Sequence, residues 1–87
     1  MLGVIIYEWQ DGEDRVVGTI RMVDGQLQAV PAENHLLQSI LSTPIRGNKY
    51  NPVPVSATED PVKFLNNLRY QYKSPYLRAS EPRELPL

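Results

Sequence analysis

The sequence predicts an α+β domain in which a three-stranded antiparallel β-meander carries two α-helices, in the order β-β-β-α-(β)-α. Residues 2–30 are rich in β-branched side chains, and they are divided by the turn sequences "DGED" and Asp24-Gly25. The apolar residues of 31–43 and of 60–73 then recur every three or four positions, as in helices. Strands followed by helices are typical of the α+β class.

The composition is that of one small globular domain. The chain has 87 residues, of which 41% are hydrophobic and 22% are charged, and its net charge is -1. It has no cysteine, which excludes disulfides, thiolate zinc sites and cysteine nucleophiles. The early apolar stretch "LGVII" is too short for a signal peptide, and no other run could span a bilayer. We therefore expect a cytoplasmic domain over residues 1–80 and a flexible tail over 81–87.

Strands are expected over 2–10, 15–23 and 26–30. For the second hairpin, the turn at Asp24-Gly25 predicts the pairs Val23–Gln26, Met22–Leu27, Arg21–Gln28 and Ile20–Ala29. For the first hairpin, a turn at Gly12-Glu13 predicts the pairs Trp9–Val16, Tyr7–Gly18 and Ile5–Ile20, with Tyr7 covering the glycine.

These registers divide the sheet into two faces. The predicted core face holds Ile5, Tyr7, Trp9, Val16, Gly18, Ile20, Met22, Leu27 and Ala29. The opposite face holds Val4, Ile6, Glu8, Val17, Thr19, Arg21, Val23, Gln26, Gln28 and Val30. About half of this second face is apolar, so we expect later segments of the chain or another chain to cover it.

Two helices should cover the core face. The first is expected over 31–43, with Pro31 in its first turn, and Pro44 follows too closely for it to continue. The connector 44–57 is long, and residues 53–57 are suited to an edge strand. Thr58 or Asp60 then caps a helix over 60–73, with Pro61 just inside it.

Catalysis has little support in the sequence. His35 is the single histidine, and no acid is placed to orient it. The acids of the turns suit turn geometry, and they lack the alternating oxygen ligands of a calcium loop. We therefore expect a protein that is not an enzyme, with no catalytic residue, no metal and no cofactor.

The favoured function is a protein-interaction module, either a homodimer or a subunit of a larger assembly. The second face of the sheet supplies Val4, Ile6, Val17, Arg21 and Val30 as candidate partner-binding residues. The loop "RGNKY" adds Arg46, Lys49 and Tyr50, because loops on a rigid scaffold often carry binding residues.

Nucleic-acid or other polyanion binding is the alternative. Residues 61–80 contain four basic residues and no acid, and the candidates are Lys63, Arg69, Tyr70, Lys73, Tyr76 and Arg78. Basic and aromatic side chains of this kind neutralise phosphates and stack on bases. However, no nucleic-acid-binding motif accompanies them, and cations near the end of a helix also complement its dipole. No membrane partner is expected.

Overall fold

The α+β fold is confirmed by a computed structural model, which describes residues 1–46, 53–71 and 76–86. Its elements are β1 (Leu2–Gln10), β2 (Glu13–Val23), β3 (Gln26–Val30), α1 (His35–Ser42), α2 (Pro61–Gln71), β4 (Leu77–Ala79) and β5 (Arg83–Glu84). The expected meander and two helices are therefore present, and two short C-terminal strands enlarge the sheet.

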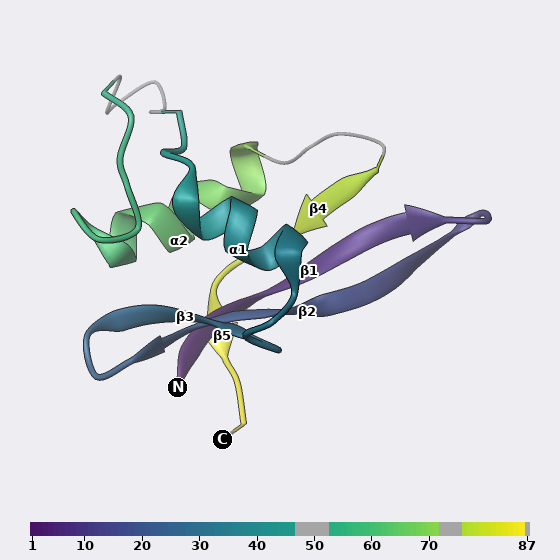
Figure 1. The fold of residues 1–87 in the computed structure, drawn as a ribbon, viewed down its shortest axis with the longest axis horizontal. Coiled ribbons are helices and arrows are strands. Elements are labelled where there is room, and N and C mark those ends of the chain that lie inside the picture. The colour runs from purple at the N-terminus through teal and green to yellow at the C-terminus, as the bar shows by residue number, and fades with distance from the viewer. Residues whose placement is uncertain (47–52, 72–75, 87) are drawn as a thin grey trace.

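The molecule has two layers (Figure 1). The sheet has the order β3-β2-β1-β4, and β5 pairs with the other end of β1. Both helices lie on one side of the sheet, and the hairpin of β1 and β2 extends beyond them as an arm. The two ends of the chain lie close together at the opposite end of the sheet. One face of the sheet thus has no helix on it among the described elements.

Both hairpins turn on an Asp-Gly pair with positive φ angles. These angles are 51° and 83° at Asp11-Gly12, and 51° and 79° at Asp24-Gly25. Such angles define the tight turn that matches the twist of paired strands. In the second hairpin the observed pairs run from Val23–Gln26 to Thr19–Val30, so the predicted register is confirmed.

The predicted register of the first hairpin is wrong. The turn lies at Asp11-Gly12, one residue earlier than expected, and Tyr7 pairs with Val16. Between Tyr7–Val16 and the next pair, Ile6–Gly18, the register shifts by one residue. Val17 is the extra residue of this β-bulge, and a bulge reverses the alternation of side chains along one strand relative to its partner.

The bulge exchanges the two faces of β1. Val4 and Ile6 are fully buried beside Ile20, whereas the prediction placed them on the outer face. Ile5 and Tyr7, predicted for the core, lie on the outer face instead. The observed core comprises Val4, Ile6, Ile20, Ala29, Leu37, Ile40, Ile45, Val55, Ala57, Phe64, Leu65 and Leu68.

Helix α1 approaches the sheet at Gly18. A Cβ atom there would lie 2.4 Å from the Val30 carbonyl oxygen and 2.7 Å from Leu37 Cδ1. Leu37 of the helix, rather than Tyr7, therefore fills the space above this glycine. The helix begins at His35 and not near Pro31, because the Asn34 side chain caps it by accepting a hydrogen bond from the Leu37 amide at 3.0 Å.

The connector between the helices supplies core residues that the sequence did not reveal. Ile45 and Val55 form an isolated antiparallel bridge, with N–H···O distances of 3.0 and 3.1 Å. Both side chains are buried, as is Ala57. The edge strand expected over 53–57 is thus reduced to this bridge, which lies outside the main sheet.

Helix α2 begins where the sequence predicts. Asp60 is the cap, and its Oδ1 accepts a hydrogen bond from the Lys63 amide at 3.0 Å. Phe64, Leu65 and Leu68 are fully buried. The polar side chain of Asn67 is also buried, at 4% exposure. Tyr72, which the helical spacing of the sequence adds to the same side as Phe64, Leu65 and Leu68, lies outside the described residues.

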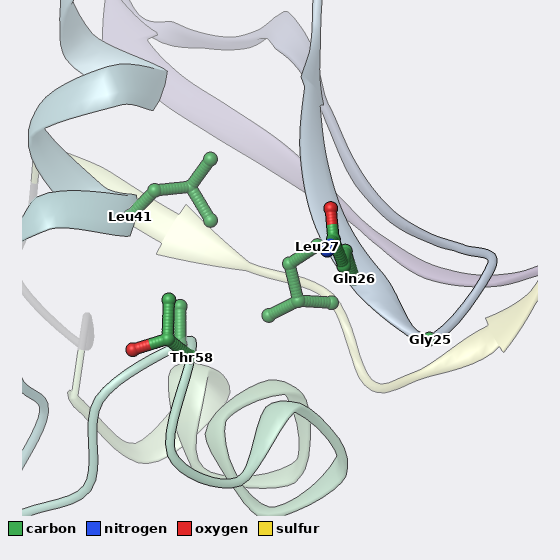
Figure 2. Close-up of a pocket in the computed structure, with 6 residues that line it drawn as sticks. Gly25, Gln26, Leu27, Leu41 and Thr58 are labelled. Carbon is green, nitrogen blue, oxygen red and sulfur yellow. The ribbon is translucent and has the colours of Figure 1, made fainter.

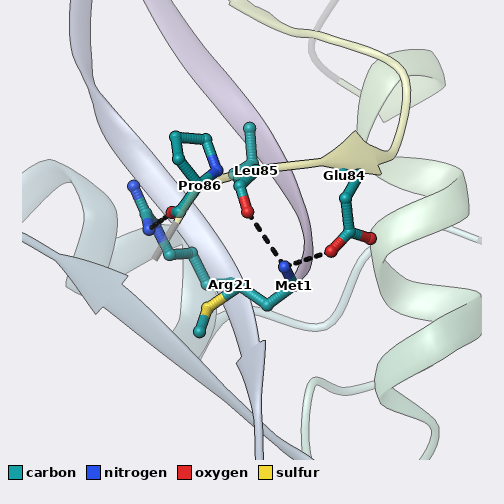
Figure 3. A network of polar contacts seen from close by, with 5 residues as sticks. All are labelled: Met1, Arg21, Glu84, Leu85 and Pro86. Atoms are coloured by element: carbon teal, nitrogen blue, oxygen red, sulfur yellow. Dashed lines mark hydrogen bonds and ion pairs between the residues drawn. The ribbon is translucent and has the colours of Figure 1, made fainter.

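The C-terminal residues 81–86, which we expected as a flexible tail, lie along the sheet in this structure. Strand β5 pairs with Leu2 and Gly3, and Leu85 is buried. A Cβ atom on Gly3 would lie 2.7 Å from Leu85 Cδ1, so the leucine occupies the space that the glycine leaves. Figure 3 shows the polar contacts at this corner: the Met1 ammonium donates to the Glu84 carboxylate and to the Leu85 carbonyl, and Arg21 donates to the Pro86 carbonyl.

Candidate functional site

The outer face of the sheet carries an apolar surface. The register places five apolar or aromatic side chains on the side away from the helices, which we call the open face: Ile5, Tyr7, Trp9, Val16 and Val30. Trp9 is 47% exposed, Val16 is 64% exposed and Val30 is 44% exposed. Ile5 and Tyr7 are partly exposed. Leu85 packs over Gly3 at one end of this side, and the described residues leave the rest of the open face accessible.

Charged side chains of both signs border the open face. Arg78 of β4 forms an ion pair with Asp14 of β2, and its guanidinium carbon lies 5.8 Å from the centre of the Tyr7 ring. At the tip of the arm the register places Arg15 and Glu13 on the other side of the sheet, where Arg15 lies 3.4 Å from Glu13 and 3.8 Å from Asp11. These groups are solvent-accessible, so they contribute little to folding stability but can orient an approaching partner.

The predicted partner-binding residues lie in different parts of the structure. Val4 and Ile6 belong to the core, so their assignment to an outer surface is wrong. Val17 is the bulged residue and packs partly against the core. Arg21 and Val30 do lie on the open side, where Arg21 also donates to Thr19 Oγ1 at 2.9 Å. In the "RGNKY" loop, Arg46 is exposed, and Lys49 and Tyr50 lie outside the described residues.

Among the residues that the structure describes, the alternative nucleic-acid candidates do not form one surface. Lys63, Arg69 and Tyr70 lie on α2, whereas Arg78 lies on β4 and points to the open side. Arg69 lies 3.4 Å from Glu81, and its guanidinium stacks 4.7 Å from the centre of the Tyr70 ring.

Two further residues complete this set: Tyr76 is 70% exposed, and Lys73 lies outside the described residues. Because Arg69 and Arg78 both have acidic neighbours, the positive charge of this segment is partly compensated.

We expect weak binding of nucleic acid for that reason, with a dissociation constant above about 10⁻⁴ M at physiological salt. The measurement is the fluorescence anisotropy of a labelled oligonucleotide, titrated with the protein at several salt concentrations. Micromolar binding that weakens steeply with salt, and that is lost in the variant Arg69→Gln, would support the alternative function instead.

A pocket of about 320 Å³ lies on the helix side of the sheet, beside the first residues of β3 (Figure 2). Gly25, Gln26 and Leu27 line one side, Leu41 and Thr58 line the other, and Ala57 also contributes to the lining. None of these side chains is ionisable, so the pocket suits an apolar group rather than acid-base chemistry. A smaller pocket of about 200 Å³ lies near Glu59, Asp60 and Lys63, where the Asp60 carboxylate already caps α2.

Within residues 1–46, 53–71 and 76–86, no three histidine, cysteine or acidic side chains come together in a group that could hold a metal ion. No helix in the same ranges has the length and apolar character required to cross a membrane.

Comparison with known proteins finds no matching family model, no similar curated protein and no similar solved structure. The function of the protein is therefore inferred from the surfaces of this chain alone.

Proposed function

We propose that the protein is a cytoplasmic, non-enzymatic interaction module that assembles with a second copy of itself through the open face. The observation that supports this proposal is the exposure of Trp9 and Val16 on the side of the sheet without helices. A large accessible aromatic side chain within an apolar patch is typical of an interface.

A second copy is the favoured partner because the open face is apolar at its centre and has both charges at its border. Two copies related by a twofold axis would bury Trp9 and Val16 against the same surface of the partner. Because each copy carries both Asp14 and Arg78, the Asp14 of one copy can approach the Arg78 of the other. The border of the interface then need not bring like charges together.

Trp9 also provides the test, because it is the only tryptophan in the chain. Sedimentation equilibrium of the intact protein should show a dimer, and Trp9 fluorescence should shift to shorter wavelength as the protein concentration rises. The variant Trp9→Ser should weaken dimerisation about thirtyfold or more, since a tryptophan at the centre of an interface often contributes at least about 2 kcal/mol.

The matched control is Val53→Ser, which also removes an exposed apolar side chain, at 72% exposure, but away from the sheet. It should leave the dimerisation constant unchanged. A strict monomer at the highest attainable concentration, or equal effects of the two variants, would reject assembly through the open face.

A further inference from the structure

The second surface with binding potential is the outer edge of β3. This strand is the first in the order β3-β2-β1-β4, and no described strand pairs with its outer side. Its sequence "QLQAV" contains no charge and no proline, which are the residues that commonly prevent an edge from pairing. The edge is therefore chemically open to another strand.

The register identifies the backbone groups that this edge offers. A two-residue turn makes Val23 and Gln26 a hydrogen-bonded pair, and such pairs alternate along an antiparallel ladder. It follows that Gln28 and Val30 bond toward β2, while Leu27 and Ala29 direct their N–H and C=O groups outward. Among the described residues, these outward groups form no hydrogen bond. Leu27 is partly exposed and therefore offers an accessible donor and acceptor, whereas Ala29 is only 5% exposed and marks the covered end of this edge.

The pocket of Figure 2 lies beside this edge on the helix side. Alternate side chains of an added strand would point toward that side, because successive side chains of a strand face opposite ways. Leu27, Leu41 and Ala57 give the pocket an apolar lining, and Thr58 stands at its rim with its side chain exposed. The pocket can therefore select one aliphatic side chain, while the backbone groups provide the general affinity.

Charged residues near the β3 edge indicate which residues of an added strand would be attracted beside the aliphatic one. Asp24 is exposed next to Gly25, so an acid adjoins the turn side of the pocket, whereas Glu59 lines the smaller pocket together with Lys63. No basic residue lines the pocket. A basic residue that lies beside the aliphatic one, near Asp24, would therefore be attracted.

We propose that the β3 edge binds an extended segment of a partner protein as an additional strand, with one aliphatic side chain in the pocket and a basic residue beside it near Asp24. This interaction is separate from self-assembly through the open face, because it uses the outer edge of β3 and the helix side of the sheet. The two can be lost independently.

The probe is a fluorescein-labelled peptide that alternates threonine and leucine between terminal lysines, measured by fluorescence anisotropy with the intact protein. Thr58→Phe fills the pocket from its rim and should lower the affinity about tenfold or more. Val62→Phe adds the same ring at an exposed position of α2 that does not line the pocket, and should change the affinity less than about twofold. Circular dichroism should show that both variants are folded.

Changes to the peptide test the proposal without altering the protein. Methylation of its central amide nitrogens removes the donors of an added strand and should abolish binding, and replacement of the lysines by glutamates should weaken it about tenfold. The variant Asp24→Asn should remove most of the preference for lysine. Equal binding of the methylated peptide, or no effect of Thr58→Phe, would overturn the proposal. So would dimerisation that is lost in Thr58→Phe and retained in Trp9→Ser, because the occupant of the edge would then be a second copy of the chain.

Discussion

Replacing Ile6 with alanine should lower the free energy of unfolding by about 2 to 5 kcal/mol, because the side chain is fully buried and its removal leaves a cavity. Ile6 lies in β1 opposite Gly18, within the cluster that includes Ile20 and Leu37. Such a loss is a large part of the stability of a domain of this size, which is near the lower end of about 5 to 15 kcal/mol. Urea denaturation, followed by circular dichroism, measures the difference.

The matched control is Ile5→Ala, one residue earlier in the same strand. Ile5 is only partly buried, on the open side, so the same truncation should cost about 1 kcal/mol in the monomer. The cost should increase with protein concentration if the open face is buried in a dimer. A larger loss for Ile5→Ala than for Ile6→Ala in the monomer would mean that β1 has the register predicted from sequence, and the open face would then lose its aromatic residues.

The contrast between the two hairpins shows what alternation of residue types can predict. In the second hairpin an Asp-Gly turn is followed by uninterrupted pairing, so the position of the turn alone was enough to predict every pair correctly. In the first hairpin the sequence does correctly place Tyr7, Trp9 and Val16 on the same face, but the bulge at Val17 turns that face outward. A bulge is a local backbone feature, and the run "RVVGTI" alternates no worse with it than without it.

The part of the fold that the sequence analysis did not predict consists of contacts between residues far apart in the sequence. Strands β4 and β5 have three and two residues, too few to give a periodic pattern, and each is stabilised by pairing with β1. Leu85 is buried because Gly3 leaves room for it more than 80 positions earlier, a distance that no local propensity encodes. The helices, with their longer apolar repeats, were predicted from local sequence alone.

The same limits apply to the candidate site. The sequence indicates that one face of the sheet retains apolar residues, and that expectation remains the basis of the proposed self-assembly. It assigns the wrong residues of β1 to this face, because a shift of one position exchanges Ile6 for Tyr7. The pocket beside β3 joins the second hairpin to Leu41 and to residues before α2, so it arises only when three separate segments are brought together.

Replacing Phe64 with alanine should lower the free energy of unfolding by about 3 to 5 kcal/mol, the largest loss expected for a single substitution in this chain. Phe64 is fully buried in the first turns of α2, where its amide donates to the carbonyl of the cap residue Asp60 at 2.9 Å. The midpoint of urea unfolding should fall by about half, with little change in the slope, because the folded state remains the same.

Val62→Ala, at a half-exposed position of the same turn, should stay within about 0.5 kcal/mol of the parent. Equal losses for the two variants would mean that α2 is rotated about its axis. The exposed Thr58 and Val62 would then be poor reference points for the pocket, and the peptide experiment would need other variants.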